Sequence, residues 1–232
     1  MFGNVYHEYE GLSKASPKVN KHPLAQAIET GYVDTDADMK EYARSLPQKP
    51  GLIAKGGTTA CTIWIHNNTL FCGNVGDSRC IVSRGCKAEE VTCDHKPVNA
   101  RERFRILQAG GKVYKRRVQG ILGVSRTLGD FRFKKDADKA PCDQMVSSVP
   151  DVVKINVTPS LDFFVLASDG IFDVISNQGV VDFILGQLKR QKQLDDISLS
   201  LIAEVGVIFS KNASLKMCKS LDNMTVIIGV LR

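Results

Sequence analysis

Short runs of β-branched, aromatic and aliphatic residues recur from Gly56 onward and constrain the fold more than any other feature of this chain. Residues 58–65 (TTACTIWI) and 70–75 (LFCGNV) flank a His-Asn-Asn-Thr turn, which is the pattern of a β-hairpin. Residues 80–83, 152–157, 163–167 and 225–230 show the same strand-like composition. A chain with this many short strands must bury sheet faces against other layers.

Helical patterns interrupt the strands. Asn99 is a candidate N-cap, with Glu102 in the first turn, an apolar face of Ala100, Phe104 and Leu107, and a Gly-Gly end at 110–111. Apolar spacing of three and four predicts further helices at 178–190 and 195–210. The first 55 residues differ, since they contain helical pieces near 22–29 and 36–45 and one possible strand at 2–6.

Strands grouped together with helices inserted in pairs predict an α+β fold, with two antiparallel sheets stacked face to face and covered by helices. We expect one domain over residues 1–232, with 1–55 as its divergent part. No apolar run approaches the ~18 residues of a spanning helix, and the first ten residues do not resemble a secretory signal. We therefore expect a cytoplasmic or nuclear monomer that does not insert in membranes.

Charge and cysteine content narrow the function classes. The net charge of +6 is mild, and no arginine–aromatic platform surrounds the densest basic run at 115–117, so we expect no nucleic-acid partner. The seven cysteines are an odd number and include no Cys-x-x-Cys pair. Reduced, buried thiols are therefore favoured over a zinc or redox site.

Three aspartates stand where strands end. Asp169 follows the strand at 163–167 and precedes a glycine, Asp222 precedes the last strand, and Asp77 lies in a Gly-Asp-Ser turn. Carboxylates that converge from strand ends suit Mg²⁺ or Mn²⁺, which prefer several oxygen ligands. Each Asp beside a glycine is also a common turn former, and that alternative remains open for any one of them.

Six segments occur in a fixed order along the chain. They are GGTTA (56–60), GDSR (76–79), DHKP (94–97), LGVSRTLGD (122–130), ASDGIFDV (167–174) and DNMT (222–225). Together they resemble the metal-dependent protein serine/threonine phosphatases of the protein phosphatase 2C family. The resemblance extends from Gly56 to the C-terminus.

The resemblance implies an αββα sandwich and a Mg²⁺ or Mn²⁺ centre whose water attacks phosphoserine or phosphothreonine in phosphorylated proteins. By motif, Asp169 and Asp222 correspond to metal ligands, and Asp77 to a weaker third-metal site shared with Asp169. Segments 94–97 and 122–130 correspond to structural segments whose buried polar groups support the strand ends. Residues 134–144 fall at the family's variable flap, which we expect to be flexible.

The N-terminal segment departs from the family pattern, which has an early phosphate-binding arginine and a Phe-Gly-Val-Tyr-Asp-Gly-His-Gly-Gly motif. The best match, residues 1–11, places His7 at the metal-bridging aspartate and Tyr9 at the general-acid histidine. We expect a sandwich without the family's first strands. His7 and Glu8 could replace the missing ligands, but a His and a Glu in an exposed N-terminal segment are more often solvated, and we favour that alternative. We assign no catalytic or substrate-binding residue.

These departures predict an incomplete metal centre with one cation at Asp169 and Asp222. They also predict negligible phosphatase activity for the chain as given. The resemblance indicates a phosphatase, and the alternative is a catalytically inactive homologue that binds phosphoproteins as a scaffold.

Overall fold

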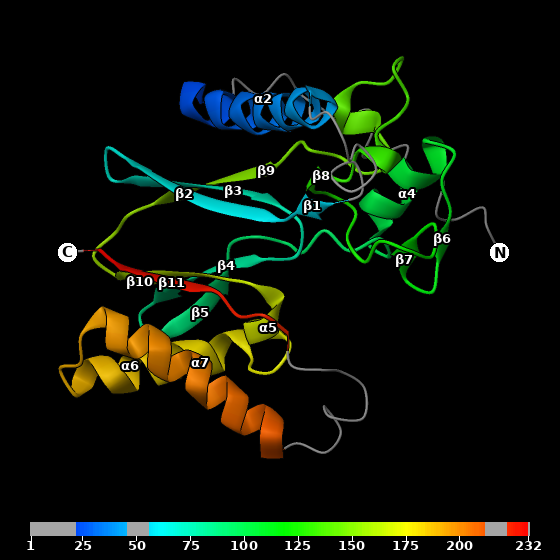
Figure 1. Ribbon diagram of the computed structural model, residues 1–232. Coiled ribbons are helices and arrows are strands. Elements are labelled where there is room, and N and C mark those ends of the chain that lie inside the picture. The colour runs from blue at the N-terminus through cyan, green and yellow to red at the C-terminus, as the bar shows by residue number, and fades with distance from the viewer. Residues whose placement is uncertain (1–21, 46–55, 212–221, 232) are drawn as a thin grey trace.

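The computed structural model describes residues 22–45, 56–211 and 222–231. One antiparallel sheet has the order β2-β3-β9 (Ala60–His66, Thr69–Val75, Asp151–Asn156). The other has the order β11-β10-β4-β5 (Val226–Val230, Leu161–Ala167, Arg79–Arg84, Lys87–Glu90). Helix α2 (Pro23–Ser45) covers the first sheet, and α6 (Asn177–Lys189) and α7 (Leu194–Lys211) cover the second (Figure 1). This arrangement confirms the predicted αββα sandwich.

Strand β10 shows why its sequence reads as a continuous apolar run. Phe163 and Val165 pack toward α6 and α7, whereas Phe164 and Leu166 belong to the cluster between the two sheets. Successive side chains of a strand point to opposite faces, so a strand buried on both faces must be apolar at every position. The strand therefore sits in the middle of the sandwich and ends at the predicted site.

Helix α2 is a single helix of 23 residues, and the prediction of two separate helical pieces was wrong. Its buried face continues past Gly31 with Ile28, Tyr32 and Asp36, at i, i+4 spacing. Gly73 of β3 permits this packing, because a Cβ there would lie 2.9 Å from Ile28 Cγ2. The Tyr32 hydroxyl donates a hydrogen bond of 2.8 Å to the Gly73 carbonyl.

Helix α4 (Ala100–Gln108) begins after Asn99 and ends at glycines as predicted, but its buried face differs from the prediction. Glu102 and Ile106 are buried, whereas Leu107 is 49% exposed. Asn99 makes no capping bond, because its side chain donates to the Asp94 carbonyl instead. The face was missed because a glutamate is rarely buried without a partner, and its partners lie on other elements.

Several short elements were not predicted. Strand β1 (Gly57–Thr58) pairs with β8 (Leu128–Gly129), and β6 (Val113–Tyr114) pairs with β7 (Arg117–Val118). A one-turn helix, α5 (Asp169–Phe172), follows β10, and 3₁₀ helices occupy Phe131–Phe133 and Pro141–Asp143. The possible strand at 2–6 lies outside the described residues. In the part of the chain that the structure describes, no helix is both long and apolar enough to cross a membrane.

The cysteines of the described ranges are all free, as expected from their reduced state. The expectation of burial holds for Cys72 and Cys80, but Cys86, Cys93 and Cys142 are exposed. Partial desolvation of the sulfur atoms and the negative charges of nearby carboxylates raise the pKa of Cys93 and Cys142, so these thiols remain protonated and weakly nucleophilic at neutral pH. Cys218 lies outside the described residues.

Candidate active site

Asp77 lies in the tight turn between β3 and β4. Gly76 adopts φ 107°, and a Cβ there would lie 2.3 Å from Thr59 Cγ2, so only glycine fits the turn. The Gly76 N–H donates to His95 Nδ1 at 3.1 Å, which fixes the turn to the segment after β5. The side chain of Asp77 is 12% exposed and forms an ion pair with Lys96. The structure thus gives Asp77 a cationic partner within the protein.

Asp169 follows β10 and begins α5, directly beside the segment that contains Asp222. The Ser168 hydroxyl donates to the Asn223 carbonyl at 3.2 Å and accepts from the Thr225 N–H at 3.1 Å. A Cβ on Gly170 would lie 2.4 Å from the Asn223 carbonyl oxygen, so glycine is needed for this close approach. The predicted neighbours Asp169 and Asp222 are therefore joined through backbone contacts.

The three predicted ligands influence each other electrostatically. Burial raises the pKa of Asp169 above its ordinary range, and the negative charges of Asp77, Asp173 and Asp222 raise it further against the opposing effect of Lys96. Carboxylates that repel each other at short range are stabilised by a shared cation. The structure thus brings Asp77, Asp169 and Asp222 to one end of the sandwich.

The fit to a metal is partial. Hard carboxylate oxygens suit Mg²⁺ or Mn²⁺, so the donor chemistry at Asp169 and Asp222 fits one such cation. No three His, Cys, Asp or Glu side chains within the described ranges are arranged to hold a metal ion together. The remaining candidates, His7 and Glu8, lie outside those ranges. As arranged, the carboxylates do not form a complete two-metal centre.

The DHKP segment supports the turn that carries Asp77. Arg79 donates to both oxygens of Asp94, at 3.1 and 3.0 Å, and stacks over the Phe172 ring. His95 receives the Gly76 N–H at Nδ1, so its Nε2 carries the proton and donates to Asp151 at 3.1 Å. With both ring nitrogens engaged, His95 has no free group for proton transfer.

A buried ionic network, which sequence reasoning missed, connects α4 to the segment 122–130. Glu102 accepts from Arg126 at 2.6 Å, from Arg105 at 2.6 Å and from the Ser125 hydroxyl at 2.7 Å. Burial opposes ionisation of Glu102, but the bonds from Arg126 and the charges of both arginines outweigh it and lower the pKa to about 2. Arg126 also binds Asp151 of β9 at 2.9 Å. The i, i+3 spacing of Glu102 and Arg105 is the one local signal of this network in the sequence.

A second buried pair ties α2 to the same region. Asp36 accepts from the Gly129 N–H and from Lys134 Nζ, each at 2.7 Å. Lys134 is 6% exposed and also donates to the Thr127 carbonyl. Gln144, at the other end of the expected flap, is buried as well. Both ends of the segment 134–144 are thus anchored, which corrects the expectation that the whole segment is a flexible loop.

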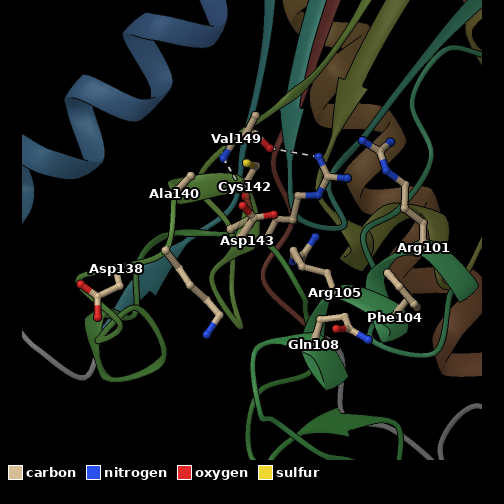
Figure 2. A pocket seen from close by; sticks show the side chains of 12 residues that line it. Arg101, Phe104, Arg105, Gln108, Asp138, Ala140, Cys142, Asp143 and Val149 are labelled. Atoms are coloured by element: carbon tan, nitrogen blue, oxygen red, sulfur yellow. Dashed lines mark hydrogen bonds between the residues drawn. The ribbon is translucent and has the colours of Figure 1, made fainter. Parts of the chain in front are cut away.

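A pocket of about 550 Å³ opens between α4 and this segment (Figure 2). Arg105 and Arg126 line it, but their donors are already engaged by Glu102 and by the carbonyls of Ser125, Gln144 and Val149. An arginine bound in this way has little capacity left for a phosphate group. Arg105 and Arg126 are therefore structural, and no phosphate clamp is assigned to them.

Comparisons with known proteins agree with this geometry. The Protein phosphatase 2C family profile matches residues 5–210. A probable protein phosphatase 2C of Caenorhabditis elegans is 34% identical over 235 residues, covering 99% of this chain and 63% of the relative. Protein phosphatase 2C homolog 2 of Schizosaccharomyces pombe is 34% identical over 217 residues, covering 94% and 56%. The chain thus spans less than two thirds of the length of these two relatives.

Solved structures show the same fold. A Caenorhabditis elegans sex determining protein superimposes with a TM-score of 0.74 at 23% identity, over 98% of this chain and 51% of that chain. Serine-threonine phosphatase 2C from Toxoplasma gondii gives a TM-score of 0.73 at 20% identity, over 98% and 75%. Taken with the sequence matches, these similarities show that the chain belongs to the protein phosphatase 2C family.

Proposed function

We propose that this chain hydrolyses phosphoserine and phosphothreonine in phosphorylated proteins, with a water activated by Mg²⁺ or Mn²⁺. The convergence of Asp77, Asp169 and Asp222 at one end of the sandwich carries the proposal. The names of the relatives support the reaction class. We further propose that it acts as a monomer in the cytoplasm or nucleus, without a nucleic-acid or membrane partner.

Within the described residues, Asp169 and Asp222 would hold the cation. When bound, the cation supplies an acidified water and offsets the charge of the phosphoryl oxygens. Ser168 and Gly170 hold the two carboxylate segments together through the Asn223 carbonyl. Asp77 can serve a further cation only if its ion pair with Lys96 opens. A metal ion at the weaker site expected at Asp77 would therefore compete with the ammonium group of Lys96.

Metal binding can be tested without any assay of activity. Calorimetric titration with Mn²⁺ should show near one equivalent, because the described carboxylates fit one cation. Asp169→Asn should abolish this binding, and Asp38→Asn on the exposed side of α2 should leave it unchanged. Two tight equivalents, or full binding by the Asp169 variant, would contradict this account of the site.

The reaction itself is tested by phosphate release from a phosphothreonine peptide, with and without Mn²⁺, using Asp169→Ala as the blank. Release that is lost in the blank and on chelation of Mn²⁺ would support hydrolysis by this site. Mn²⁺ binding without any release would contradict the proposal. It would favour the inactive homologue that the departures at His7 and Tyr9 predict.

A further inference from the structure

The segment around the β6–β7 hairpin is strongly and one-sidedly charged. Between Glu102 and Asp130 the sequence contains seven Lys and Arg residues and no Asp or Glu. Two of the seven, Arg105 and Arg126, are engaged by Glu102. Four of the others, Lys112, Lys115, Arg116 and Arg117, fall within six residues and are exposed. We refer to residues 112–117 as the cationic hairpin.

Among the described residues, no carboxylate pairs with the charges of the cationic hairpin. The pocket of Figure 2 differs in this respect, because its buried arginines already bind carboxylate and carbonyl oxygens. Within the described residues, the exposed positive charge of this segment is therefore concentrated on the hairpin and not in the pocket.

The backbone holds these cations in a fixed and unfavourable conformation. Lys115 and Arg116 form a two-residue turn with φ values of 48° and 63°, a type I′ geometry in which Asn-Gly is usual. The Gln119 N–H donates to the Lys112 carbonyl at 2.8 Å, and Arg117 donates to the Ile121 carbonyl at 2.9 Å. Two long cationic side chains thus occupy a turn that local stability does not favour.

Exposed apolar groups flank the charges. Tyr114 is 63% exposed and Ile121 is 52% exposed, next to Val118, which is fully buried and anchors the hairpin. The hairpin lies at the same end of the sandwich as α5, the helix that begins at Asp169 (Figure 1). Tyrosine and arginine are enriched in protein-binding surfaces, and charges at the rim of such a surface select a partner of opposite charge.

We propose that the cationic hairpin docks an acidic segment of a protein partner. Charge complementarity selects this partner, since four cations without a carboxylate partner in the described chain attract carboxylates, while Tyr114 and Ile121 contact apolar side chains between them. A single-stranded nucleic acid fits less well, because Tyr114 is the one aromatic residue of the hairpin and Lys115 Nζ lies 5.5 Å from its ring centroid. That the partner is a phosphatase substrate rests on the proposed function, whereas the docking itself does not.

The double variant K115N/R116G tests the effect of the positive charge on binding without disrupting the fold of the hairpin. Asn-Gly is the preferred pair for a type I′ turn, so the variant should keep the hairpin while removing both cations at its tip. Its melting temperature should equal or exceed that of the parent chain. K112Q/R117Q removes the other two cations without changing the turn. R190A/K192A, a matched charge loss where α6 leads into α7 at the opposite end of the molecule, is the control (Figure 1).

Binding is measured by fluorescence anisotropy of a labelled, unphosphorylated peptide of Asp, Glu and Leu, and of its Asn, Gln and Leu counterpart. The acidic peptide should bind preferentially and more weakly as ionic strength rises. Each hairpin variant should weaken its binding by about three- to tenfold, as expected for the loss of two exposed ion pairs. The control should bind like the parent.

Equal binding of the two peptides, or unchanged binding by both hairpin variants, would overturn the proposal. Tighter hairpin-dependent binding of a single-stranded RNA or of anionic lipid vesicles would also overturn it, in favour of that partner. The peptides carry no phosphate, so a failure here leaves the phosphatase proposal untouched. A failure of phosphate release would likewise leave the docking result valid.

Discussion

Replacement of Glu102 by glutamine tests whether the buried network stabilises this fold. The substitution keeps the size of the side chain but leaves Arg105 and Arg126 without their carboxylate. Both guanidinium groups are well buried, with side-chain exposures of 12% and 3%. The remaining carboxylate, Asp151, is shared with His95 and Arg101 and cannot replace Glu102.

Two independent estimates give the loss of unfolding free energy that we expect for E102Q. A pKa of about 2 in place of the ordinary 4.5 corresponds to about 3 kcal/mol of stabilisation when Glu102 is ionised. Removal of one partner from a buried ion pair typically costs about 3–5 kcal/mol, because the other charge stays buried. We therefore expect E102Q to lower the free energy of unfolding by about 3 kcal/mol at neutral pH.

The pH dependence has a definite sign. The pKa of Glu102 is lowered in the folded state, so its contribution is complete above the unfolded value and is lost as pH falls. The parent chain should lose stability from about pH 5 downward, and E102Q should lose less over the same interval. The pKa of Asp151 is also lowered, because the hydrogen bond from His95 and the charges of Arg126 and Arg101 outweigh the effect of its burial. Asp151 therefore adds an acid-sensitive contribution that is common to both proteins.

Urea unfolding, followed by far-ultraviolet circular dichroism at several pH values, measures both effects. E89Q is the matched control, because Glu89 pairs with Arg84 at the surface with side-chain exposures of 49% and 27%. An exposed pair of this kind is worth less than about 1 kcal/mol. A loss in E102Q no larger than in E89Q, or parallel pH profiles for E102Q and the parent, would refute the argument.

Two further substitutions test the contacts around the site. D36N leaves buried Lys134 without its carboxylate, so urea unfolding should show that the free energy of unfolding falls by about 2–4 kcal/mol. An unchanged free energy of unfolding would contradict a stabilising ion pair between α2 and Lys134. G170A places a methyl group against the Asn223 carbonyl and should weaken Mn²⁺ binding in calorimetry, because the two carboxylate segments must separate. G186A, in open space on α6, should leave Mn²⁺ binding unchanged and stabilise the chain by about 0.5–1 kcal/mol.

The sequence predicted the strands and the last two helices well, because their patterns reflect local burial. Strand 163–167 is apolar at each position since both of its faces are covered, and β10 includes it. Helices at 178–190 and 195–210 agree with α6 and α7 to within one residue at each end. The three strand-end aspartates lie at one end of the sandwich because β10 pairs with β4 and β11, and their role as metal ligands stays a prediction.

Long-range pairing accounts for most of what the sequence did not reveal. Glu102 faces inward because Arg126, 24 positions away, meets it there, and no local pattern records that contact. Asp36 is buried because Lys134 and the Gly129 N–H reach it from 98 and 93 positions away. The ion pair between Lys96 and Asp77 is likewise a long-range contact that no local sequence pattern records. A periodicity argument treats such charged residues as solvent-facing and therefore assigns the wrong face to α4.

These pairings also bear on how a phosphoryl group could be bound. A phosphomonoester carries nearly two negative charges at neutral pH, and it would approach a site that already contains the carboxylates of Asp169 and Asp222. The described cations nearest this site, Lys96 and Arg79, are paired with Asp77 and Asp94. Within the described residues, the positive charge that offsets the phosphate must therefore come largely from a bound divalent cation. In the proposed reaction, substrate binding and hydrolysis should then depend on the same metal, because without it the carboxylates would repel the phosphoryl group.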